Sequence, residues 1–106
     1  MYSVKSQRDL IAYKLTLDLY KEVIKSDYPD TELFKLKKAL NKIAGYISRA
    51  VGECLYPKTV IYNYKKSIKW VYIADKLLKV EHKKNIVEVR KILFTLIKKL
   101  EEKMNE

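Results

Sequence analysis

The chain has 106 residues, of which 48% are hydrophobic and 34% are charged, and its formal net charge at pH 7 is +10. This length and apolar content predict a single folded domain over residues 1–106 and exclude a disordered basic tail. The excess of basic residues, with a sequence pI near 9.6, favours anionic partners.

Two glycines and two prolines leave few positions at which a helix would break, which favours a few long helices and an all-α fold. The one cysteine, Cys54, excludes an intrachain disulfide and fits a reducing compartment. The sequence shows neither a signal peptide nor the run of about 18–20 apolar residues that a membrane span needs. We therefore expect a cytoplasmic protein with no membrane partner.

The first helix is expected from about Ser6, a suitable N-cap, to Lys25. This segment carries two apolar rows at helical spacing. The first row is Leu10, Tyr13, Leu17, Tyr20 and Ile24, and the second is Ala12, Leu15, Leu19 and Val23. Pro29 disfavours the helical conformation for Tyr28, which predicts a turn after this helix.

The second helix is expected from Asp30 or Thr31 to about Leu55. Its apolar residues alternate three and four positions apart along its whole length, which is the clearest helical periodicity in the chain. They are Leu33, Leu36, Leu40, Ile43, Ile47, Ala50 and Cys54, so the Cys54 thiol is expected to be buried.

The third helix is expected to begin near Lys58–Val60 and to reach Lys79, with a short polar link over residues 81–84. Its buried row is Ile61, Tyr64, Ile68, Val71 and Leu78, and an adjacent row is Trp70, Ala74 and Leu77. Asn85 and Glu88 have capping-box spacing and predict a last helix from Asn85 to about Lys103. Its apolar row is Ile86, Val89, Leu93, Leu96, Leu100 and Met104. Four such helices with short links predict an antiparallel up-down-up-down four-helix bundle.

The apolar surface exceeds what one face per helix requires. The first helix has two apolar rows, and the second adds Phe34 and Val51 beside its main row. One interpretation is a wide core face within a single bundle. The other is self-association into a closed ring or a dimer, to which nine tyrosines would contribute interface side chains.

Basic charge is concentrated in the third helix, where residues 58–79 hold six lysines and one acidic residue, Asp75. One row, at spacings of 3, 4, 3, 4 and 3, is Tyr62, Lys65, Lys69, Tyr72, Lys76 and Lys79. Ammonium groups interleaved with aromatic rings suit a phosphate backbone with bases or sugars beside it. They also suit an acidic protein, and a solvated face without any ligand is a further alternative.

The second helix carries another basic row, with Gly45 in its gap. A glycine in mid-helix lets a backbone, a subunit or a phosphate approach closely, or marks a helix–helix crossing. Together the two helices predict ten nucleic-acid-binding residues. They are Lys35, Lys38, Lys42, Arg49, Tyr62, Lys65, Lys66, Lys69, Tyr72 and Lys76.

No catalytic or metal-binding pattern is visible in the sequence. The single histidine, His82, lies in a charged link without a partner motif and is expected at the surface. Cysteine and histidine spacings typical of a metal site, and a glycine-rich phosphate loop, are absent from the sequence. We therefore expect a protein that is not an enzyme and needs no cofactor and no metal.

The succession of segments resembles a known bacterial family. The points of likeness are Asp9-Leu10 opening a Tyr- and Leu-rich first helix, Tyr28-Pro29, a long second helix, and Leu77-Leu78 before a short link. The family is that of the four-helix-bundle proteins encoded in 23S rRNA intervening sequences and the accessory variability determinants (Avd) of diversity-generating retroelements. The resemblance implies a basic pentameric barrel that binds nucleic acid and a reverse transcriptase.

The leading hypothesis is thus a non-enzymatic, homo-oligomeric scaffold that binds RNA or DNA with low sequence specificity, as a retroelement accessory protein. The alternative is a protein–protein adaptor whose basic face docks an acidic partner, without any nucleic-acid role.

Overall fold

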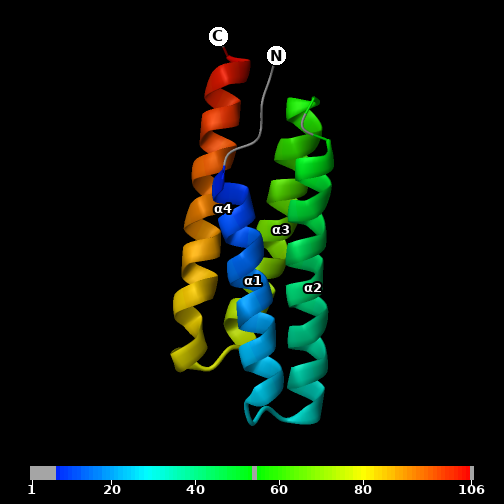
Figure 1. Cartoon of the computed structure of the whole chain (residues 1–106), viewed down its shortest axis with the longest axis vertical. Helices are drawn as coiled ribbons and strands as arrows, with labels where there is room; N and C mark the ends of the chain where they lie inside the picture. The colour runs from blue at the N-terminus through cyan, green and yellow to red at the C-terminus, as the bar shows by residue number, and fades with distance from the viewer. Residues whose placement is uncertain (1–6, 54, 106) are drawn as a thin grey trace.

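The computed structural model describes residues 7–53 and 55–105, and across these ranges it is an all-helical bundle (Figure 1). The helices are α1 (Gln7–Lys25), α2 (Asp30–Gly52), α3 (Pro57–Leu77) and α4 (Lys83–Met104), and a 3₁₀ turn, η1 (Val80–His82), precedes α4. Consecutive helices run in opposite directions, so the predicted antiparallel four-helix bundle is confirmed. Both Ser6 and Cys54 lie outside the described residues.

Each helix has two neighbours in the bundle. α1 packs against α2 and α4, and α3 packs against the same two helices from the other side. The resulting rod measures 48 × 20 × 19 Å. Because α1 and α3 are diagonal partners, their solvent-exposed faces point to opposite sides of the molecule.

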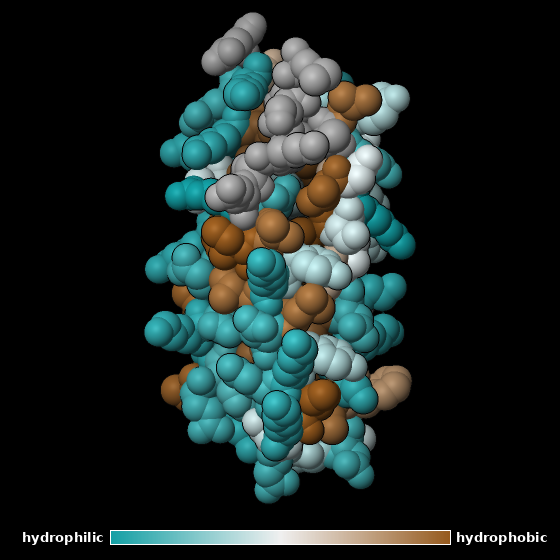
Figure 2. Space-filling view, viewed as in Figure 1, coloured by the Kyte–Doolittle hydropathy of each residue, from teal (hydrophilic) through white to brown (hydrophobic). Residues whose placement is uncertain are grey.

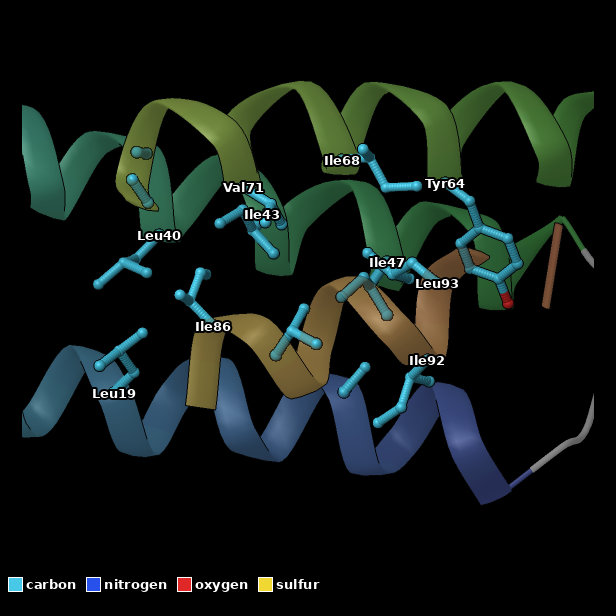
Figure 3. Close-up of a cluster of buried hydrophobic side chains, with 14 of the residues drawn as sticks. Leu19, Leu40, Ile43, Ile47, Tyr64, Ile68, Val71, Ile86, Ile92 and Leu93 are labelled. Atoms are coloured by element: carbon cyan, nitrogen blue, oxygen red, sulfur yellow. The ribbon is translucent and has the colours of Figure 1, made fainter. Parts of the chain in front are cut away.

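Apolar side chains from all four helices meet along the bundle axis (Figure 3). Leu19, Leu40, Tyr64 and Leu93 represent the four helices in this core, and each is less than 2% exposed. Burying one such side chain stabilises a fold by about 1.5–3 kcal/mol. The hydroxyl of Ser67 donates a hydrogen bond of 3.1 Å to the Ile43 carbonyl, which fixes the register of α3 against α2.

The residues of the two apolar rows of α1 differ in burial. Ala12, Leu19 and Val23, from the second predicted row, are buried completely. Leu10, Leu17 and Ile24, from the first row, are exposed. Ile11 lines a hollow with residues of α4, so these three exposed side chains lie on the opposite flank of α1, toward α2. Tyr13 and Tyr20 of the first row are half-buried against the core, so the core face of α1 is wide but does not include Leu10, Leu17 and Ile24. These three residues are called the apolar seam below.

The limits of α2 and α3 differ from their predicted positions by a few residues. α2 ends at Gly52, whereas the sequence predicted about Leu55. α3 begins at Pro57. Proline is well tolerated at the first position of a helix, because a backbone N–H there would have no hydrogen-bond partner within the helix.

The connection from α3 to α4 also departs from the prediction. α3 ends at Leu77, since Leu78 has an extended backbone, so Lys79 is not part of the helix. α4 begins at Lys83, which makes Asn85 its third residue and excludes the predicted capping box. Met104, predicted in the core row of α4, is exposed at the end of the bundle.

The α1–α2 turn is fastened to the α3–α4 connection by hydrogen bonds around Tyr28. The hydroxyl of this buried tyrosine accepts the Lys79 N–H at 2.9 Å and lies 2.8 Å from Nδ1 of His82. Nε2 of His82 lies 3.3 Å from the Ser26 hydroxyl, which suits a tautomer with its proton on Nε2. We call these four residues the Tyr28 clasp. His82, expected at the surface, is half-buried in it.

Candidate nucleic-acid interface

The predicted basic row of α2 lies on its solvent-exposed side, next to α3. Its members Lys35, Lys38, Lys42 and Arg49 are all exposed. The Lys38 ammonium lies 5.9 Å from the centroid of the Trp70 ring on α3, which shows that this row borders the groove between the two helices. We call this the α2–α3 groove.

The predicted row on α3 spreads over the exposed surface of the helix instead of facing one way. Tyr62 is 57% exposed, and the Lys66 ammonium lies 5.5 Å from its ring centroid. Tyr72 turns toward α4, where the Arg90 guanidinium lies 5.9 Å from its ring. Lys65 also turns toward α4 and lines a hollow there with Phe94. The α3 residues therefore connect the groove to the α4 side of the bundle.

The ten predicted residues lie on two helices that pack side by side, α2 and α3, although Lys65 and Tyr72 turn toward α4. We call the surface that carries them the basic face. Lys66 is half-buried, and the other nine are exposed. The one acidic residue of α3, Asp75, lies 3.9 Å from Lys83 of α4, so its charge is directed away from α2. The described chain shows no ion pair for any of the eight predicted cations.

A shallow trough of about 690 Å³ runs along the outer side of α2. Gly45 and Asn41 line it together with longer side chains, among them Lys38, Lys42 and Arg49. A Cβ atom at Gly45 would meet nothing within 4 Å. Gly45 is therefore not at a helix–helix crossing within the bundle, and the trough is open to an approaching ligand or subunit.

Sequence reasoning missed three contributors to this surface. Trp70 was placed in the row adjacent to the buried row of α3 and not among the binding residues, yet it is half-buried and lies beneath Lys38. Tyr46 lies 5.2 Å from the Arg49 guanidinium, and Arg90 extends the positive charge onto α4. Tyr46 is four residues after Lys42 and three before Arg49, a helical spacing that would have revealed it. Trp70 and Arg90 could not be found this way, because each contacts another helix.

A buried carboxylate lies away from the basic face, near the start of α1. Asp9 is 4% exposed, accepts the Leu10 N–H at 2.8 Å, and lies 3.4 Å from the Tyr64 hydroxyl. Burial raises the pKa of Asp9, although these hydrogen bonds oppose the shift. Within the described ranges, no three His, Cys, Asp or Glu side chains are grouped as a metal site would require.

Comparisons with known proteins provide no relative for this chain: no family model, curated protein or solved structure matches it. The resemblance to the intervening-sequence and Avd proteins thus stays a prediction from the sequence. Among the helices described, none combines the length and apolar character needed to cross a membrane.

Proposed function

We propose that this chain is a non-enzymatic, homo-oligomeric scaffold whose basic face binds the phosphate backbone of RNA or DNA. The observation that supports this function is the gathering of eight cations, from two antiparallel helices, on one surface that also exposes aromatic rings. Lysine and arginine side chains that neutralise phosphates release counterions from the nucleic acid, which provides affinity without sequence preference. The family resemblance adds a reverse transcriptase as an expected protein partner.

Self-association through the apolar seam fits the same scaffold. Apolar side chains gather along the α1 side of the bundle (Figure 2). α1 has four basic and three acidic residues, whereas α3 has five basic residues and one acidic residue, so copies would meet with the least repulsion at α1. A contact there leaves the basic residues of α3, which is diagonal to α1, open to nucleic acid.

Titration of labelled RNA and DNA at about 50 mM and about 200 mM salt, followed by fluorescence anisotropy, tests the proposed function. A variant with Lys38, Lys42 and Lys66 changed to alanine removes three charges from the α2–α3 groove. We expect weaker binding to every sequence and a salt dependence whose slope is lower by about 2 to 3, because three phosphate contacts are lost.

The matched control changes Lys14, Lys21 and Lys25 of α1 to alanine. It removes the same charge from α1, which is diagonal to α3, and should leave the slope of the salt dependence nearly unchanged. Equal losses in the two variants would show that net charge alone is responsible and would refute the assigned site. No binding at about 50 mM salt would refute the function and favour an adaptor that docks an acidic protein.

A further inference from the structure

Three of the predicted cations lie over aromatic rings around the α2–α3 groove. Lys38 lies over Trp70, Arg49 over Tyr46 and Lys66 over Tyr62, at 5.9, 5.2 and 5.5 Å from the ring centroids. A cation within about 6 Å of a ring face is attracted by the π electrons. Each pair therefore places a phosphate-binding charge directly beside a surface on which a flat base can stack.

We propose that the ligand of this groove is a single strand, whose bases stack on Trp70 and on the two tyrosines while its phosphates bind the neighbouring cations. This inference rests on the proposed function and narrows its ligand. Bases in a duplex are already stacked on one another, so their faces cannot reach the half-buried rings of Trp70 and Tyr46. The bases of a single strand are free to stack on aromatic side chains.

The spacing of the rings suits a short stretch of strand. The Ser67–Ile43 hydrogen bond sets a register in which Tyr46 and Tyr62 lie near one level of the groove. Trp70 is eight residues from Tyr62, which corresponds to roughly 12 Å along the helix axis. At about 3.4 Å per nucleotide, this separation spans some three to four nucleotides of a stacked strand.

Trp70 is the best placed of the three rings, because it joins the core to the surface. Its apolar body packs against the core cluster, which holds the ring in a fixed position. The ammonium group of Lys38, a solvent-exposed residue, lies over one side of the Trp70 ring. When a phosphate draws Lys38 away, a base can occupy the ring face without any change in the backbone.

The single tryptophan provides a direct probe of this contact. Trp70 fluorescence would be followed while the protein is titrated with a 12-nucleotide dT strand, a 12-base-pair duplex and, as a base-free control, inorganic polyphosphate. We expect much stronger quenching by the single strand than by polyphosphate or the duplex, because phosphate alone only displaces Lys38, whereas a stacked base contacts the indole directly. Equal quenching by polyphosphate or by the duplex would overturn the inference.

The second arm compares Trp70→Leu with Tyr20→Leu. Both aromatic residues are half-buried against the core, but Tyr20 lies on α1, diagonal to α3. The loss of one stacked base should lower the single-strand affinity of Trp70→Leu by at least about tenfold, which is about 1.4 kcal/mol, and should leave its duplex affinity unchanged. Tyr20→Leu should alter neither affinity.

The outcomes separate this inference from the proposed function. Equal binding of strand and duplex, with no effect of Trp70→Leu, would refute base stacking while the phosphate-binding function survives. Failure of the strand, the duplex and polyphosphate to bind would refute the proposed function itself.

Discussion

Replacing Gly45 with alanine tests whether the trough on α2 is open. Gly45 is in the interior of α2, is exposed, and has no atom within 4 Å of the position that a Cβ would occupy. Alanine would thus add helix propensity without a steric conflict. Glycine in a helix interior is less favourable than alanine by about 0.8–1.0 kcal/mol. We expect Gly45→Ala to raise the free energy of unfolding by about that amount.

Urea unfolding followed by far-UV circular dichroism would measure this gain, and the midpoint of thermal unfolding should rise by about 4–8 °C. Gly52→Ala is the matched control. Gly52 is equally open but is the last residue of α2, where the helix frays, so its substitution should produce a smaller gain. Unchanged or lower stability for Gly45→Ala would refute the open trough and indicate that another copy or segment packs on Gly45. An affinity loss in the stabilised variant would place a phosphate against the α2 backbone.

Three further predictions concern the clasp, the buried carboxylate and the apolar seam. Tyr28→Phe removes the hydroxyl that bonds the Lys79 N–H and His82, and should lower the free energy of unfolding by about 1–3 kcal/mol. Tyr56→Phe, at a side chain that is 65% exposed, should change the free energy of unfolding little. Because folding raises the pKa of Asp9, the native state loses stability as pH rises from about 4 through that raised pKa. Asp9→Asn should therefore be more stable relative to the parent protein at pH 7 than at pH 3.5, and a difference that does not vary with pH in urea titrations would contradict this. Ile24→Glu should dissociate the proposed oligomer in sedimentation experiments. Ile11→Glu, on the other flank of α1 at nearly equal exposure (47% against 46%), should not. An assembly that survives Ile24→Glu would exclude the apolar seam as its interface.

Local periodicity was sufficient to predict the fold class. The apolar residues of α2 repeat at helical spacing with little competition from other patterns, and most of the predicted row is buried, including Leu36, Leu40, Ile43, Ile47 and Ala50. Pro29 marked the start of α2, because proline disfavours the helical conformation of the residue before it, whereas α2 ends at Gly52 and not near Leu55 as predicted. The lysine content of α3 likewise predicted an exposed basic face, because charged side chains rarely leave water.

The packing of helices decided what one helix alone cannot specify. α1 has two apolar rows of comparable regularity, and the positions of α2 and α4 determine that Leu19 is buried while Leu17 remains exposed. Trp70 became part of the basic face because Lys38 of the neighbouring helix lies over its ring. His82 is half-buried, and not at the surface as predicted, because the turn that carries Tyr28 packs against the α3–α4 connection at one end of the bundle. These contacts join residues 32 and 54 positions apart, so their geometry follows from the tertiary arrangement, whereas helix positions and charge follow from the local sequence.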